Sequence, residues 1–576
     1  MSSAARQLQP ILVPEAAIIC EAFSCAETRT GSRMRDGALF RHVSRNLHLP
    51  LRGEGGEVGR GAGGAGLRRS PYRRARGTGK MLSGVLNAYA RSNVWDEDLF
   101  HRLSQAVKAL SPRDVATQDI ATIVNAFARA TTRDKSRFRD GALFLHMSRV
   151  AQAKDPNEFR ARDVANIVNA LARVGVWDEA LFRKMSTVVR SMSARELPLR
   201  DAARIVCAFT LAFTRRGSRL RDGSLFRHVS DVSVSVLTGS DLDDVSAADI
   251  SALAQAYTRA GIWDERLFRT VSAAARRLDK RSIEPRAIAS LVLAFSQVET
   301  REGSRLRDGA LFIHMSSIVK GLDSRALAKE PQVVANIVNA FAKAGVWDEE
   351  LFRFLSRTAR QTSATSMQPS DCGAVVGSFA KAQSRQGARL KDGALFRRMS
   401  LIVQQSQPSR FTPRAVANIA SGFAHADIHD ARLLQRMARL ACGLEPAGWL
   451  DGFGEHALRA FKTQELASLS WALAKSANSL SGLSASSLPL GLQQGGAGGM
   501  GRGEGGGGGD AYEFYFRHLA EHLQWRGLAA FKAQEVSTLL WSVAVGLSKE
   551  YVVQVVNASA SRPSWRPSTV RRVTCD

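Results

Sequence analysis

The sequence predicts an all-α protein, specifically a right-handed α-solenoid of two-helix repeats with about 38–46 residues per unit, in which short and long units alternate. Related segments recur at a fixed period along the 576-residue chain. Each copy combines apolar residues at helical spacing with an aspartate that is typical of a helix start. A single helical hairpin leaves too much apolar surface in water, so such units are stable only when they are stacked.

The first helix of each unit carries a clear apolar stripe. In the segment 163–173, Val164, Ile167, Val168 and Leu171 fall at positions i, i+3, i+4 and i+7. This spacing is typical of an amphipathic helix that buries one face.

The second helix of each unit is predicted to begin at an aspartate. A carboxylate there can accept hydrogen bonds from the first-turn N–H groups and favours the positive end of the helix. In most units Leu-Phe follows three residues later and supplies the buried face. The column consists of Asp36, Asp96, Asp140, Asp178, Asp222, Asp264, Asp308, Asp348, Asp392 and Asp430.

A small residue before the central aromatic of the first helix measures the period. Its copies are separated by 38, 44, 38, 48, 38, 46 and 38 residues, so the true period is a double repeat. Short units end in Trp-Asp, whereas long units carry a basic loop before Asp-Gly. The small residues are Ala88, Ala126, Ala170, Ala208, Ala256, Ala294, Ala340 and Ser378.

The chain is expected to divide into eight segments. We expect a targeting segment at 1–17, a first repeat at 18–50, a Gly/Arg-rich insertion at 51–80, and the main array at 81–445; these are followed by a degenerate repeat at 446–490, a Gly-rich linker at 491–510, a further degenerate repeat at 511–556 and a disordered tail at 557–576. Neither Gly-rich stretch follows a strand or precedes Gly-Lys-Ser/Thr, which argues against a nucleotide-binding loop.

Charge points to a polyanionic partner. The formal net charge is +27 and the pI is near 10.7, which favours a nucleic acid while anionic lipid and acidic protein stay open. No apolar run approaches the roughly 20 residues of a membrane span, so no membrane insertion is expected. The six cysteines are scattered and no histidines cluster with them, so we expect no metal, no cofactor and no disulfide framework.

One face of the first helices repeats an amide and a cation four residues apart, which places both side chains on the same side of a helix. Amides can pair with base edges while cations bind phosphate, as suits a single-stranded nucleic acid. The alternative is that the amides bond the neighbouring hairpin and the cations are only solvated. The candidate residues are Asn87, Arg91, Asn125, Arg129, Asn166, Asn169, Arg173, Gln255, Arg259, Asn336, Asn339, Lys343 and Lys381.

The basic loops of the long units form a second candidate surface. Equivalent loops lie along one edge of a solenoid, so their cations would form a row that follows a phosphate backbone without reading sequence. The alternative is a solvated charged loop. These residues are Arg33, Arg35, Arg137, Arg139, Arg219, Arg221, Arg305, Arg307, Arg389 and Lys391.

Two further repeated residue types are expected to be structural. Trp95, Trp177, Trp263 and Trp347 stand beside the capping aspartates and are predicted to close the hairpin, while Trp471 and Trp541 are predicted to be core. A serine recurs eight residues after the aspartate, as in Ser148 and Ser316, and a histidine stands two residues before it in some units but not in others. It is therefore expected to pack rather than to act as a nucleophile.

The Asn-Ala-Phe-Ala-Lys343 and Trp-Asp-Glu-Glu-Leu-Phe352 motifs resemble those of organellar RNA-binding helical-repeat proteins, from about residue 18 to residue 440. This group comprises octotricopeptide and heptatricopeptide proteins, the kinetoplastid RNA-editing substrate-binding complex repeat protein and FAST-kinase-like proteins. The resemblance implies binding of single-stranded RNA in RNA processing, editing, stability or translation, in the mitochondrion or alternatively the plastid.

Partners implied by the same resemblance are other organellar RNA-processing proteins or the ribosome. Many members end in a nuclease-like RAP domain, but residues 557–576 are Ser/Pro/Arg-rich without strand alternation. We therefore expect no such domain and no enzymatic activity. The alternative function is a protein-interaction scaffold of armadillo or HEAT type.

Overall fold

The computed structural model describes residues 11–25, 37–48, 78–131, 138, 140–212, 222–239, 242–300, 308–382, 392–445, 454–486, 510–547 and 549–560. The chain forms two compact units, Met1–Leu278 and Asp279–Asp576. The basic-loop candidates Arg33, Arg35, Arg137, Arg139, Arg219, Arg221, Arg305, Arg307, Arg389 and Lys391 lie outside the described residues.

The N-terminal unit consists of helical hairpins, with one short parallel strand pair at its start. Its elements are β1 (Ile11–Leu12), α2 (Val13–Cys25), α3 (Gly37–Asn46), β2 (Leu47–His48), α4 (Thr78–Ser92), α5 (Glu97–Lys108), η2 (Pro112–Asp114), α6 (Thr117–Arg129), α7 (Gly141–Gln152), η3 (Pro156–Glu158), α8 (Ala161–Val174), α9 (Glu179–Ser191), α10 (Leu199–Leu211), α11 (Gly223–Thr238), α12 (Ala247–Ala260) and α13 (Glu265–Arg277).

The C-terminal unit continues the same hairpin pattern. Its elements are α14 (Pro285–Gln297), α15 (Gly309–Lys320), α16 (Ser324–Leu327), α17 (Pro331–Ala344), α18 (Glu349–Gln361), α19 (Pro369–Phe379), α20 (Gly393–Gln405), η4 (Pro408–Arg410), α21 (Pro413–His425), α22 (Ala431–Ala441), η5 (Gly454–Ala460), α23 (Thr463–Ser486), α24 (Asp510–Arg526), η6 (Leu528–Ala530), α25 (Ala533–Gly546) and α26 (Lys549–Ala560).

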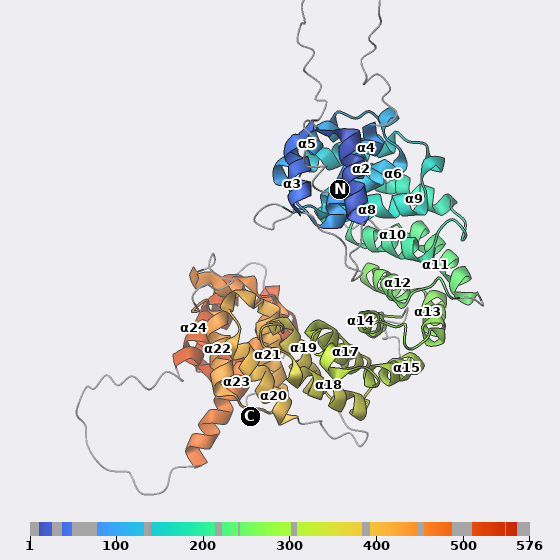
Figure 1. Ribbon diagram of the computed structural model, residues 1–576. Coiled ribbons are helices and arrows are strands. Elements are labelled where there is room, and N and C mark those ends of the chain that lie inside the picture. Colours follow the sequence, from blue (N-terminus) through green and yellow to red (C-terminus); the bar gives the residue numbers. More distant parts are fainter. Residues whose placement is uncertain are drawn as a thin grey trace, which may run out of the picture. The chain divides into compact units, whose positions relative to one another are not determined.

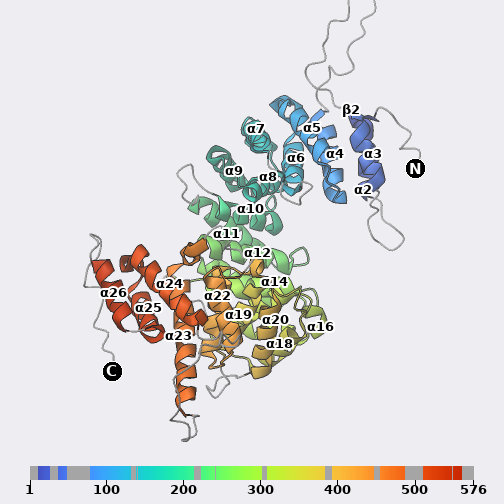
Figure 2. The ribbon, with the colours of Figure 1, turned by 90° about the vertical axis from the view of Figure 1, so that its left-hand side faces the viewer.

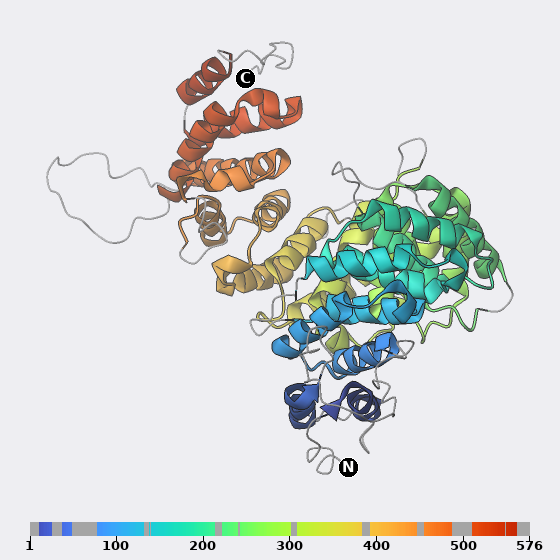
Figure 3. The ribbon, with the colours of Figure 1, turned by 90° about the horizontal axis from the view of Figure 1, so that it is seen from above.

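Each unit has two layers of helices (Figure 1). In the N-terminal unit the first helices α4, α6, α8, α10 and α12 pack side by side, and the second helices α5, α7, α9, α11 and α13 form the other layer, as Figure 2 shows for α4 to α9. In the C-terminal unit α14, α17, α19, α21, α23 and α25 form the first layer, and its orange-to-red end is a stack in Figure 3. The predicted α-solenoid of two-helix repeats is therefore confirmed.

Close packing between first helices explains the small residue that measures the period. In α21 this position is Gly422, where an added Cβ would lie 2.7 Å from Val376 Cγ2 and 3.0 Å from the backbone nitrogen of Gly377 in α19. A larger residue there would push the two helices apart, and overpacking of this kind destabilises a core. At Gly422 the residue is small because the preceding first helix rests on it.

The turn that follows the first helix of a short unit depends on a left-handed residue. Gly175, Gly261 and Gly345 have φ angles of +73°, +66° and +68° at the ends of α8, α12 and α17. The next amide bonds back into the last turn, as when Val176 N donates to Leu171 O at 3.1 Å, which is how glycine commonly ends a helix. These tight turns are what make the short units short.

The aspartate column caps the second helices as predicted. In every case that the structure describes, from Asp96 to Asp430, the carboxylate accepts a backbone N–H of the first turn, as Asp348 Oδ1 does from Leu351 N at 3.1 Å. The cap position therefore has a direct structural role in each hairpin.

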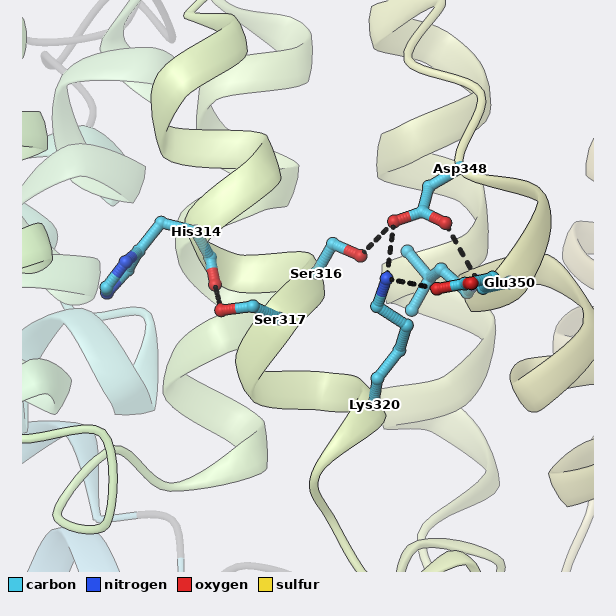
Figure 4. A network of polar contacts seen from close by, with 7 residues as sticks. His314, Ser316, Ser317, Lys320, Asp348 and Glu350 are labelled. Carbon is cyan, nitrogen blue, oxygen red and sulfur yellow. Dashed lines mark hydrogen bonds and ion pairs between the residues drawn. The ribbon is translucent and has the colours of Figure 1, made fainter. Parts of the chain in front are cut away.

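The same carboxylates bind the preceding hairpin, which the sequence did not predict. Ser316 Oγ donates to Asp348 Oδ2 at 2.5 Å, and Lys320 joins the pair (Figure 4). A buried serine hydroxyl is thus satisfied by the cap of the next second helix. The equivalent bonds join Ser44 to Asp96, Ser104 to Asp140, Ser148 to Asp178, Ser230 to Asp264, Ser356 to Asp392 and Ser400 to Asp430.

Part of the positive charge serves the stacking of second helices. In several units, a basic side chain six residues after the capping aspartate bonds to the last carbonyls of the preceding second helix or to the turn that follows it. Arg398 donates to Thr362 O at 2.9 Å, Arg436 donates to Val403 O and Ser406 O at 2.7 Å, and His146 contacts Leu110 O at 3.0 Å. Cations favour the negative end of a helix, so these residues join neighbouring hairpins.

Several helix bounds differ from the predicted segments. Helix α2 begins at Val13, inside the segment assigned to targeting. Leu12 N donates to Glu15 Oε2 at this helix start, and Pro14 fits a first turn. The Gly-rich segment 491–510 falls between α23 and α24, which belong to one hairpin, rather than between two repeats. Among the described residues, no helix is long and apolar enough to cross a bilayer.

Candidate nucleic-acid interface

Four columns of each first helix face away from the second-helix layer. Relative to the small residue, they stand eight and four residues before it, one before it and three after it, a spacing of one helical face. In α8 these positions are Arg162, Asn166, Asn169 and Arg173. The outermost two columns are mostly exposed and the inner two mostly half-buried throughout α4 to α25. We call this surface the first-helix ridge.

The amide column lies one residue before the small residue and is half-buried. In the described part of the chain, the side-chain amides of Asn87, Asn125, Asn169 and Asn339 have no hydrogen-bond partner. The described residues therefore show no amide ladder to the neighbouring hairpin at these four positions. Each amide keeps donors and an acceptor that a ligand can reach.

One predicted amide is held by its neighbour. Arg204 Nη2 of α10 donates to Asn166 Oδ1 of α8 at 2.7 Å, and Arg204 also lies 3.6 Å from Asp201. Asn166 therefore joins two first helices through its carbonyl and leaves only its NH₂ group for a ligand. Asn336, the equivalent residue of α17, is half-buried without such a partner among the described residues.

The cation column three residues after the small residue is exposed in most units. Arg91, Arg129, Arg173 and Lys381 are exposed, whereas Lys343 is half-buried. In α12 the amide and the cation meet directly, because Arg259 Nη2 donates to Gln255 Oε1 at 3.2 Å. This bond confirms that the two columns share one side of the helix, as their spacing predicts.

The column eight residues before the small residue was missed in the sequence analysis. It adds exposed cations to the ridge. The missed signal was that this offset falls on the same helical face as the amide column. No acidic residue occupies any of the four columns in the described helices α4 to α25. The added cations are Lys80, Arg162, Arg200, Arg286 and Arg414.

Acids beside α8 and α10 are withdrawn into the gaps between first helices, whereas Glu330 pairs with the exposed ridge cation Arg286 at 2.8 Å. Asp163 is only 5% exposed, and burial raises the pKa of its carboxyl above the ordinary value. Burial likewise raises the pKa of Asp201, and burial lowers the pKa of the Arg204 guanidinium beside it. Since these carboxylates are sheltered from water, the outer surface of the ridge is dominated by cations and amides.

The tryptophans of the short units pack as predicted. Each lies half-buried beside the cap and contacts the phenylalanine of the second helix, with ring centroids 5.6 Å apart for Trp95 and Phe100. For Trp177, Trp263 and Trp347 the equivalent distances are 6.0, 5.4 and 5.6 Å.

The prediction of core positions for Trp471 and Trp541 is wrong. Trp541 is 37% exposed and Trp471 is half-buried. Both residues stand in the amide column of the ridge, one residue before the small residues Ala472 and Ser542, so the helix turns them away from the core. The apolar stripe beside them made them resemble core residues in the sequence.

The described residues contain no group of three or more His, Cys, Asp or Glu side chains placed to hold a metal ion. Where a serine of a second helix bonds to an aspartate, as Ser148 and Ser316 do, no histidine takes part in the bridge, and the ridge lies on the other layer. The arrangement offers hydrogen bonds and positive charge along a surface, as a binding interface does.

Comparison with known proteins agrees with the repeat motifs. Residues 78–329 match the family model of the RNA-editing substrate-binding complex 6 protein. The chain is also similar to the crystal structure of the pentatricopeptide repeat protein PPR10 in complex with an 18-nt psaJ RNA element (10% identity, 95% of this chain and 93% of that chain covered, TM-score 0.19).

A second similar structure is a circular tandem repeat protein with novel repeat topology and enhanced subunit contact surfaces (13% identity, 97% and 95% covered, TM-score 0.14). At these TM-scores neither structure superposes on the whole chain. No curated protein matches the sequence. The resemblance to the RNA-editing substrate-binding complex repeat protein is therefore confirmed over residues 78–329, from α4 to the segment before α17.

Proposed function

We propose that the chain binds single-stranded RNA along the first-helix ridge. The observation that carries this proposal is the pairing of an exposed cation with a half-buried amide in α4, α6, α8 and α12, in ridge columns that hold no acidic residue. The match of residues 78–329 to a family named for binding RNA-editing substrates supports it, because that range contains the ridge from Lys80 to Arg286.

The two kinds of side chain have different tasks in this proposal. Exposed arginines such as Arg129 and Arg173 contact phosphates, which supplies affinity that falls with salt and carries little sequence information. Amides such as Asn125 and Asn169 hydrogen-bond to base edges, as single-stranded RNA allows because its bases are unpaired. Where Cys207 or Leu293 replaces the amide, the preference for a base changes.

The same family match supports a proposal for the biological setting. We place the chain in organellar RNA editing, processing, stability or translation, in the mitochondrion rather than the plastid, with other RNA-processing proteins or the ribosome as partners. The basic loops of the long units contribute contacts to the phosphate backbone. The chain acts as a binding protein and not as an enzyme.

Photocrosslinking tests which surface holds the RNA. The full chain is crosslinked to a 4-thiouridine-labelled single strand, and the linked peptides are mapped by mass spectrometry. We expect links to peptides from the first helices α6, α8 and α17. Links confined to second helices such as α9 and α18 would contradict the ridge, and the absence of any RNA-dependent link would favour the scaffold alternative.

A further inference from the structure

The first-helix ridge changes its chemistry at the end of the C-terminal unit. In α23 and α25 the amide column carries Trp471 and Trp541 instead of an amide. Trp541 is 37% exposed, whereas Leu540 and Val543 of the same helix are buried.

Trp471 is held in place by an imidazole ring and a lysine. The ring of His425, at the end of α21, lies 4.4 Å from the Trp471 ring at an interplanar angle of 44°. Lys475 Nζ, one turn after Trp471, lies 5.4 Å from its centroid and bonds to Ala424 O at 2.7 Å and to Asp427. The indole is thus fixed beside a cation instead of filling a core.

Trp471 and Trp541 occupy equivalent positions on adjacent helices. Helices α23 and α25 pack side by side, and packed helices are about 10 Å apart. Polar side chains surround the two indoles on the same face: Gln464, Ser468 and Lys475 on α23, and Gln534 and Thr538 on α25. In α23 and α25, none of the four ridge columns holds an acidic residue.

We propose that Trp471 and Trp541 are stacking platforms for unpaired nucleobases. The inference rests on the proposed function, since the bases belong to the RNA that follows the ridge. Every base has a π-face, so stacking on an aromatic ring is tolerant of sequence. Within the C-terminal unit, the amides of α17 would read base edges, whereas α23 and α25 would hold the strand by stacking.

An abasic RNA separates stacking from phosphate binding. Affinity of the full chain is measured for a uridine oligomer and for an abasic oligomer of equal length and charge. Alanine removes a stack that is typically worth about tenfold in affinity. We expect Trp541→Ala to bind the uridine oligomer about tenfold more weakly than wild type does. The same variant should bind the abasic oligomer as tightly as wild type does. Trp541→Phe should restore most of the lost affinity for the uridine oligomer.

Trp525 provides the matched control. It is 52% exposed on the second helix α24, where Arg459 lies 3.8 Å from its ring, and it is outside the ridge. Trp525→Ala should leave both affinities unchanged. Circular dichroism of each variant checks that the helices remain folded. We also expect wild type to bind the uridine oligomer more tightly than the abasic one, a comparison that needs no variant.

The outcomes separate the two proposals. If wild type binds both oligomers equally and Trp541→Ala changes neither, the stacking proposal is overturned while RNA binding stands. If wild type binds no RNA, the proposed function itself fails. If Trp541→Ala releases a protein partner and leaves RNA affinity unchanged, the two indoles form a protein-docking patch and not a base platform.

Discussion

Ser316 and Asp348 join two successive hairpins through one carboxylate. Ser316 Oγ donates to Asp348 Oδ2 at 2.5 Å, while Asp348 Oδ1 accepts Leu351 N at 3.1 Å (Figure 4). One oxygen therefore caps its own helix and the other satisfies a buried hydroxyl of the helix before it. The bridge explains why aspartate and serine recur together in most units.

Removing the serine hydroxyl should destabilise the chain only where the bridge exists. Ser148 and Ser186 are 2% and 1% exposed in the same unit, but only Ser148 bonds to the next cap, whereas Ser186 Oγ has no partner among the described residues. We expect Ser148→Ala to lower the free energy of unfolding by about 1 kcal/mol and Ser186→Ala to be neutral or slightly stabilising. Urea unfolding followed by circular dichroism measures both, and equal losses would contradict the bridge.

Stability should depend on pH through Asp348. Burial acts to raise its pKa, but hydrogen bonds from Ser316 and Leu351 N and the charge of Lys320 outweigh it and hold the pKa below the ordinary value of 3.8. A carboxylate whose pKa is lower in the folded state stabilises the fold above its unfolded pKa, and this contribution is lost as the pH falls through the folded pKa. Between about pH 5.5 and about pH 3, the urea midpoint of Asp348→Asn should therefore fall less than that of wild type. An identical fall in both proteins would contradict the assignment.

Arginines of the two layers should separate stability from RNA affinity. Arg436 donates to the C-terminal end of α20, whereas Arg414 is exposed on the ridge of α21. Arg436→Met removes helix-end hydrogen bonds and should lower the urea midpoint without changing RNA affinity. Arg414→Met removes a phosphate contact and should do the reverse. A loss of RNA affinity in Arg436→Met at full stability would place RNA on the second-helix layer.

Two asparagines on one helix should respond differently. Asn169 has no partner in the described chain, whereas Asn166 accepts a bond from Arg204. Asn169→Ala should change the preference among homopolymeric RNAs and leave stability intact. Asn166→Ala leaves the half-buried Arg204 without that acceptor, so it should also lower the free energy of unfolding by about 1 kcal/mol. Unchanged base preference in Asn169→Ala would assign the amide column a role other than base recognition.

Repetition made most of the fold predictable. The stripe from Val164 to Leu171 and the caps from Asp96 to Asp430 follow from local periodicity, and each was found where it was predicted. The Ser316–Asp348 bridge could not be derived in the same way, because it joins residues 32 positions apart and depends on how one hairpin rests on the next.

The ridge was only partly predictable for a related reason. Spacing alone paired Asn169 with Arg173 on one face, but it did not reveal which amides the neighbouring helix would hold, as Arg204 holds Asn166. Trp541 misled the prediction because its apolar neighbours resemble a core stripe, and its exposure depends on the register of α25 against α23. Both are properties of stacked helices that a single helix does not encode.

The salt dependence of RNA affinity, compared between wild type and a quadruple charge reversal, tests the central claim most directly. Arg91, Arg129, Arg173 and Arg259 are exposed on the ridge of the N-terminal unit. If each binds one phosphate, Arg→Glu at all four positions should abolish retention at moderate salt with helicity intact, and a matched four-site Arg→Gln variant should show a slope of log affinity against log salt that is shallower by about 3. Wild-type affinity and an unchanged slope in these variants would contradict RNA binding by the first-helix ridge.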